Sequence, residues 1–150
     1  MSIPKVLPDE LVVRNLYPAI RALIATELVR KYKFKQQDAA ARLGVSQAAI
    51  SYYLSQKRGA AQSFIKSEFV KKSIDKFAEG IAMNKITEEE LVIGLTKLID
   101  YILSNRELCE LHKKIERNLD VDKCHICEER FKISAEIYVK NLINKIEKDS

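Results

Sequence analysis

Apolar residues recur at spacings of three and four along most of the chain, which is the period of an amphipathic helix. A clear example lies between residues 67 and 83, where the apolar positions are four, three and four apart: Val70, Ile74, Phe77 and Ile81. Strand signals are weak, and the 150 residues include only four glycines and three prolines. The sequence therefore predicts an all-α fold.

Capping residues indicate where several of these helices begin. Thr87 and Glu90 form a capping box, in which each side chain accepts a hydrogen bond from an amide of the first turn, and the helix that follows is expected to reach Ser104. Asp9 has the character of a cap for a short first helix. Pro18 suits the first turn of a second helix that runs to about Tyr32.

A final helix is expected from about residue 131 to residue 147, and its apolar face is wide. The face can pack on the protein's own core, or it can pack partly against a second copy of the chain. Its apolar residues are Phe131, Ile133, Ala135, Ile137, Tyr138, Leu142, Ile143 and Ile146.

Residues 36–54 carry the steric signature of two short helices that cross through a tight turn. Ala40 supplies a small contact, and Gly44 stands where the first helix must end, because glycine enters the left-handed conformation at little cost. Val45 fills the corner, and Ser46 is a good N-cap for the second helix. The second helix has an expected buried stripe of Ile50, Tyr53 and Leu54.

This segment resembles the DNA-binding helix-turn-helix of the phage repressor and Cro class, called XRE-type. The residues that carry the resemblance are Gln36, Ala40, Gly44, Val45, Ile50 and Tyr53. The resemblance implies that the second helix enters the major groove. It assigns base-edge contacts to Ser46, Gln47, Ala48, Ser51 and Tyr52. It also implies that Gln36 contacts a phosphate and braces the glutamine that faces the groove. The alternative is an ordinary helix pair in a helical core.

Gln47 is the strongest candidate for reading a base. A glutamine side chain can bond to both N6 and N7 of adenine, whereas Ala48 offers only a methyl contact to thymine.

The charge distribution favours DNA binding over an ordinary helix pair. Residues 1–66 hold eleven Lys or Arg against four Asp or Glu, and residues 67–150 hold fifteen against seventeen, so the net charge of +5 arises in the half with the motif. Lys57 and Arg58 follow the second helix, where phosphate contacts are usual, and such contacts give affinity and salt dependence without reading sequence. Further basic residues precede the first helix: Arg30, Lys31, Lys33 and Lys35.

The three cysteines and two histidines lie close together in the second half of the chain. Cys109 and His112 are three apart, so on a helix they share a face, and the turn between Cys124 and Cys127 brings two sulfurs together. Four soft ligands in two pairs suit tetrahedral zinc, and an iron-sulfur cluster is the alternative. His125 is not expected to be a ligand, although it could take the place of His112 in the site. The alternative to a metal site is that the cysteines are small buried hydrophobic residues and the histidines are surface residues.

These features predict a DNA-binding domain over residues 1–66 and a helical region for dimerisation and metal binding over residues 67–150. Because one helix-turn-helix touches few base pairs, we expect a homodimer that binds double-stranded DNA, with recognition helices about 34 Å apart. The metal or cluster would stabilise or switch this regulator. Four filled ligand positions favour a structural or sensing role, so we expect no enzyme activity.

The whole arrangement is similar to a group of predicted archaeal transcriptional regulators, which combine such a motif with a Cys/His tail. No apolar stretch approaches the roughly 18 residues that cross a membrane, and a secretion signal is missing, so we expect a cytoplasmic protein. Two other functions stay open. An antitoxin-like interaction module would co-purify with a small partner protein, and a metal or cluster redox protein would take up electrons without binding DNA.

Overall fold

The computed structural model describes residues 4–55, 65–130 and 134–148, which form helices and connecting turns with no strand among them. The all-α prediction is confirmed for this part of the chain. None of the described helices is both long enough and apolar enough to cross a bilayer. In chain order the elements are α1 (Pro8–Leu11), the π-helical η1 (Val12–Leu16), α2 (Tyr17–Arg30), α3 (Gln36–Leu43), α4 (Gln47–Ser55), α6 (Glu68–Ala82), α7 (Glu88–Ser104), α8 (Cys109–Ile115), α9 (Ile126–Arg130) and α10 (Ser134–Lys148).

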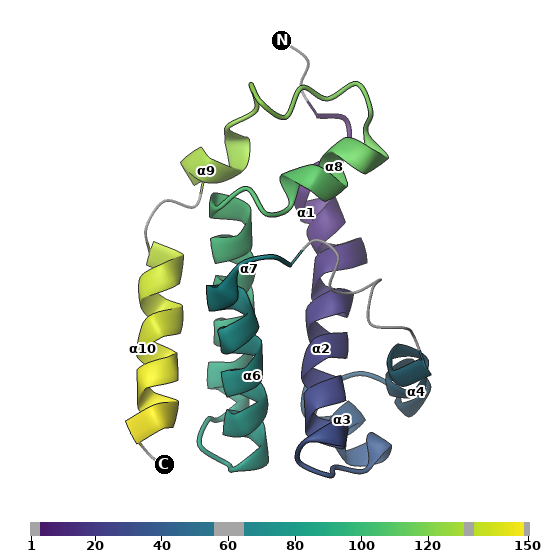
Figure 1. Ribbon diagram of the computed structural model, residues 1–150, viewed down its shortest axis with the longest axis vertical. Helices are drawn as coiled ribbons and strands as arrows, with labels where there is room; N and C mark the ends of the chain where they lie inside the picture. Colours follow the sequence, from purple (N-terminus) through teal and green to yellow (C-terminus); the bar gives the residue numbers. More distant parts are fainter. Residues whose placement is uncertain (1–3, 56–64, 131–133, 149–150) are drawn as a thin grey trace.

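The first three elements run on without a break, so residues 8–30 form one long helical rod (Figure 1). The prediction that Asp9 caps a separate short helix is therefore wrong. The N-cap is Leu7, whose amide donates to the Glu10 carboxylate at 2.8 Å, and Asp9 already lies inside the first turn.

Pro18 lies within this rod and accounts for its π-helical stretch. A proline inside a helix removes one backbone hydrogen bond, and its ring crowds the carbonyl four residues earlier. The wider turns of η1 come directly before it and relieve that crowding, so the rod continues through Pro18, which lies in the first turn of α2 as predicted.

The N-terminal boundaries of α6 and α7 follow local capping signals. The Ser67 hydroxyl accepts a hydrogen bond from the amide of Val70 at 3.4 Å. Thr87 and Glu90 form the predicted capping box, with bonds of 3.1 Å to the Thr87 hydroxyl and 3.0 Å to the Glu90 carboxylate. This box and the end of α7 at Ser104 are confirmed.

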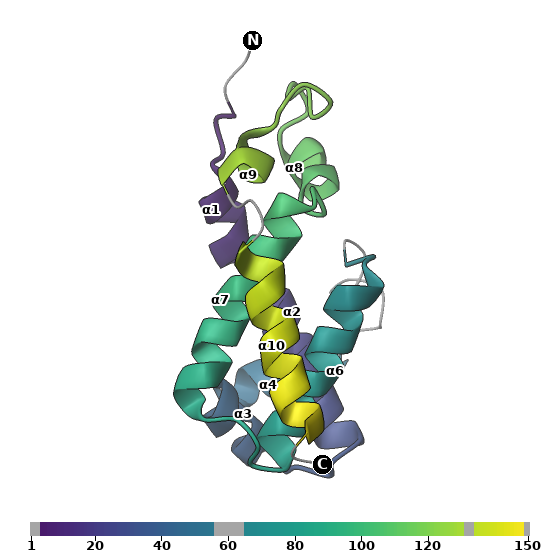
Figure 2. The ribbon, with the colours of Figure 1, turned by 90° about the vertical axis from the view of Figure 1, so that its left-hand side faces the viewer.

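The core lies between four long helices. α2 packs against α6, and α10 packs against both α7 and α6 (Figures 1 and 2). The buried apolar side chains form one cluster that extends from Leu11 to Ile146. Gly94 on α7 faces α10, since an added Cβ would lie 2.8 Å from Cδ2 of Leu142. A larger residue at Gly94 would therefore force the Leu142 side chain to shift.

The described part of α10 turns most of its apolar residues towards the core. Ile137 is the exception, since 54% of its surface is exposed. The buried apolar residues are Val139, Leu142, Ile143 and Ile146. Packing on the protein's own core accounts for these four, while Phe131, Ile133 and the side chain of Ala135 lie outside the described residues.

Candidate functional site

The turn between α3 and α4 is defined by its backbone and by one side chain. Gly44 has a φ of 66°, and the amide of Val45 donates to the carbonyl of Ala40 at 3.0 Å. The Ser46 hydroxyl accepts from the amide of Ala49 at 3.1 Å and so caps α4. An added Cβ on Gly44 would meet no described atom within 4 Å, so the glycine is required by its backbone angle and not by space. The predicted roles of Gly44 and Ser46 are confirmed.

Helix α4 has a buried side and an exposed side. Ile50 is fully buried, and α4 packs on α2 and α3. The five residues predicted to contact bases are all exposed, with Tyr52 at 61%: Ser46, Gln47, Ala48, Ser51 and Tyr52. Gln36 is half-buried at the start of α3, Leu54 is half-buried, and the Tyr53 side chain lies outside the described residues.

Basic side chains surround the segment that leads into α3. The four predicted before this helix are all exposed: Arg30, Lys31, Lys33 and Lys35. Lys57 and Arg58 lie outside the described residues. Arg42 on α3 donates to Oδ1 of Asn84 at 3.1 Å and so ties α3 to the turn between α6 and α7.

The four predicted metal ligands line one cavity of about 20 Å³. Cys109 and His112 lie on α8, Cys124 lies in the loop before α9, and Cys127 lies in the first turn of α9. Pro8 of α1 also lines the cavity. This volume suits one water molecule or one ion. Residues that are up to 18 positions apart in the sequence are thus brought to one place.

The two histidines occupy different environments. His112 is 6% exposed, and its buried Nε2 has no hydrogen-bond partner among the described residues. The nearest carboxylate is Glu116, whose Oε1 is 3.8 Å away and accepts bonds from the amides of Lys5 and Val6. His125 is mostly exposed, and its Nδ1 lies 3.2 Å from a carboxylate oxygen of Glu128.

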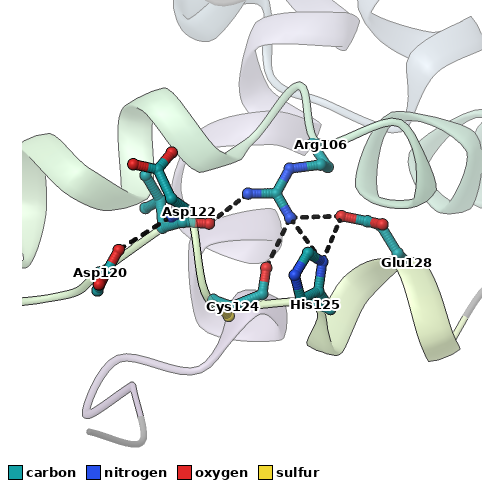
Figure 3. A network of polar contacts seen from close by, with 7 residues as sticks. Arg106, Asp120, Asp122, Cys124, His125 and Glu128 are labelled. Atoms are coloured by element: carbon teal, nitrogen blue, oxygen red, sulfur yellow. Dashed lines mark hydrogen bonds and ion pairs between the residues drawn. The ribbon is translucent and has the colours of Figure 1, made fainter. Parts of the chain in front are cut away.

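A polar network centred on Arg106 holds the loop and α9 beside the cavity (Figure 3). Its guanidinium donates to the carbonyls of Val121 and Cys124, and it pairs with the carboxylate of Glu128. It also lies 3.4 Å from Nδ1 of His125. Arg106 has a φ of 62°, which is unusual for a residue with a side chain. The sequence carries no signal for this role, because an arginine after a helix is usually solvated.

The three cysteines are free thiols that influence one another. Burial raises the pKa of Cys127 to about 11, and the Cys109 and Cys124 sulfurs add to the effect. Burial also raises the pKa of Cys109, which Arg106 opposes. A cation between the sulfurs would instead favour the thiolate forms. As placed, no three His, Cys, Asp or Glu side chains in the described ranges are arranged to hold a metal ion.

The two candidate regions lie at opposite ends of the molecule (Figures 1 and 2). We call α3, α4 and their turn the α3–α4 unit, and we call α8, α9 and the loop between them the Cys/His end. α2 connects the two regions, since it packs on α3 and α4 and is continuous with α1, which carries Pro8 of the cavity.

Comparisons with protein-family models, with curated proteins and with solved structures find no significant match for this chain.

Proposed function

We propose that the protein is a sequence-specific, DNA-binding regulator of transcription with an XRE-type helix-turn-helix. The observation that carries the proposal is the two-sided character of α4, in which Ile50 anchors one side and the other side exposes Ser46, Gln47, Ala48, Ser51 and Tyr52. A helix that reads base edges must fit into the major groove and present donors and acceptors there. The exposed side of α4 meets both requirements.

Gln47 is the proposed principal reading residue. It is exposed in the first turn of α4, and N-terminal residues of a recognition helix are the ones that reach base edges. Gln36 opens α3 and is half-buried, as suits a residue that would brace the groove-facing side chain and touch phosphate.

Exposed basic residues supply the electrostatic part of the proposal. The lysines and arginine that precede α3 lie next to the turn into the α3–α4 unit, where they would contact the phosphate backbone. Such contacts are released as salt rises, so the affinity for any duplex should fall steeply with ionic strength.

We further propose that the protein binds DNA as a homodimer, because one α4 covers too few base pairs for useful specificity. The helices after residue 67 offer exposed apolar side chains for this contact, among them Val92 on α7 and Ile137 on α10. Light scattering of the purified protein tests this part of the proposal. A 17.2 kDa species at micromolar concentration, which is the mass of one chain, would contradict it.

Selection of binding sites from a random duplex library tests the DNA-binding function directly. We expect an enriched two-fold symmetric site. Gln47→Ala should relax the preference at one position of each half-site by about tenfold, which corresponds to about 1.4 kcal/mol, and leave binding to random DNA unchanged.

The matched control is Asn118→Ala, which removes an exposed amide at the Cys/His end. It should select the same site as the wild type. If the library shows no enrichment at any salt concentration, the proposed function is wrong. If Gln47→Ala selects the wild-type site unchanged, only the assignment of Gln47 fails.

A further inference from the structure

We infer that the cavity at the Cys/His end binds one zinc ion through Cys109, His112, Cys124 and Cys127, with Arg106 as a positioning residue. The inference does not depend on DNA binding, since it rests on residues at the other end of the molecule.

The ligand set suits zinc. Three sulfurs and one imidazole are soft or borderline donors, and four such donors from protein side chains give a closed tetrahedral site of the structural kind. The two pairs come from separate segments, α8 and the start of α9. An ion held by both pairs would join these segments across the loop at residues 116–125.

His112 is the observation that points most directly to a ligand. Its side chain lines the cavity, and its Nε2 is buried without a hydrogen-bond partner in the part of the chain that the structure describes. A buried polar atom of this kind is unfavourable unless something bonds to it. A metal ion in the cavity would satisfy this nitrogen.

The size of the cavity distinguishes one ion from a cluster. At about 20 Å³ it accommodates a single ion, whereas an iron-sulfur cluster contains several iron and sulfide atoms. A single ion therefore fits the cavity at its present size, whereas a cluster would require the cavity to widen.

Arg106 connects the two ligand pairs without being a ligand. It precedes Cys109 by three residues, it donates to the carbonyl of Cys124, and it pairs with Glu128 beside Cys127 (Figure 3). The second ligand pair is therefore held next to the first by contacts that involve no ion. Outer residues that orient ligands in this way typically change metal affinity by about 10–100-fold.

Binding requires the four side chains to turn inwards, because as placed they do not form a coordination shell among the described residues. The bonds from the Arg106 guanidinium to the carbonyls of Val121 and Cys124 hold the loop before α9 in place. We therefore expect the four ligand side chains to rotate while the backbone stays where it is.

The test uses the full chain without an affinity tag, freed of metal under reducing conditions and titrated with zinc or with cobalt as a spectroscopic probe. We expect one ion per chain, a visible cobalt spectrum of tetrahedral thiolate type, and protection of three thiols from alkylation. His112→Gln should change the cobalt spectrum and weaken zinc binding at least tenfold. The matched control, His125→Gln, should keep the spectrum.

Arg106→Gly removes the guanidinium but keeps a residue that accepts a positive φ. Any change in zinc affinity is then due to the lost guanidinium contacts and not to backbone strain at this position. The variant should weaken zinc binding about tenfold and leave the shape of the cobalt spectrum unchanged, which a lost ligand would not do.

Unchanged alkylation of the wild-type thiols in excess zinc would overturn the inference, and this measurement does not require any variant to fold. Iron and sulfide in anaerobically purified protein, without zinc binding, would also overturn it. Loss of the cobalt spectrum in His125→Gln but not in His112→Gln would show that the ligand set is wrong.

Discussion

The α3–α4 unit and the Cys/His end are stabilised in different ways. The α3–α4 unit is held on α2 by apolar packing of Ala39, Ala40, Leu43 and Ile50, all of which are buried. The Cys/His end has fewer buried apolar residues, and its loop and α9 depend on the polar contacts of Arg106. Apolar packing fixes a surface without any ligand, whereas polar contacts around a small cavity suit a region that an ion completes. The two ends should therefore respond to different perturbations.

The largest difference should come from removing apolar volume at each end. Ile50→Ala removes a fully buried side chain of α4 and should lower the free energy of unfolding by about 3 kcal/mol. Ile126→Ala, at the start of α9, removes a side chain that is 44% exposed, and it should cost less than about 1 kcal/mol. Urea denaturation of both variants measures this. Equal losses would mean that the two ends do not differ in apolar packing.

Removal of zinc should have the next largest effect, and it should act at one end. With zinc bound, amides of α8 and α9 should exchange hydrogen at least about tenfold more slowly than in the metal-free protein, equivalent to about 1.4 kcal/mol or more. Amides of α3 and α4 should be unchanged, since they lie at the opposite end. Hydrogen exchange with and without a chelator checks this. A change in α4 as well would indicate that the ion switches the proposed DNA-binding surface and does not only stabilise its own end.

The features that could be predicted from the sequence are those decided by neighbouring residues. Gly44 ends α3, and Ser46 and Thr87 cap the helices that follow them, because each acts within one turn of its own position. The spacing of the cysteines and His112 also identified four of the residues that line the cavity.

The features that were missed depend on contacts between distant residues or on competing local effects. Arg106 bonds to residues 15 to 22 positions further along the chain, and no local pattern indicates such partners. Asp9 is a good capping residue, but Leu7 is the N-cap and the helix begins at Pro8, two residues earlier than a cap at Asp9 would give. Pro18 lies in the first turn of α2 as predicted, but the sequence does not indicate the π-helical stretch that joins α2 to the helix before it.

A smaller effect is expected at the turn of the α3–α4 unit. Gly44→Ala places a side chain at a φ of 66° and should cost about 1 kcal/mol, although no described atom within 4 Å would clash with it. Gly44→Asn should cost less, because asparagine tolerates the left-handed conformation. Thermal unfolding of both variants measures the difference. If Gly44→Asn destabilises the protein as much as Gly44→Ala does, the loss of stability comes from steric crowding and not from the backbone angle.

The smallest effect concerns Glu90, which lies on the first turn of α7, close to the turn that Arg42 contacts. A hydrogen bond from Lys145, and then one from the amide of Thr87, hold the pKa of Glu90 below its ordinary value of 4.5. Because the folded pKa is the lower one, the ionised carboxylate stabilises the fold above pH 4.5, and this contribution is lost as pH falls through the folded value.

Glu90→Gln keeps an acceptor for the capping box but loses the charge, so it measures what the charge contributes through Lys145 and through the amide of Thr87. At neutral pH it should cost about 0.5 kcal/mol, since the pair is partly exposed, and the cost should vanish as the pH falls below the folded pKa of Glu90, which is itself under 4.5. Glu89→Gln, at an exposed neighbouring position, is the control and should change neither quantity. Denaturation across this pH range measures both variants. A cost for Glu90→Gln that persists in acid would come from altered geometry of the cap, whereas a cost that disappears comes from the loss of the charge.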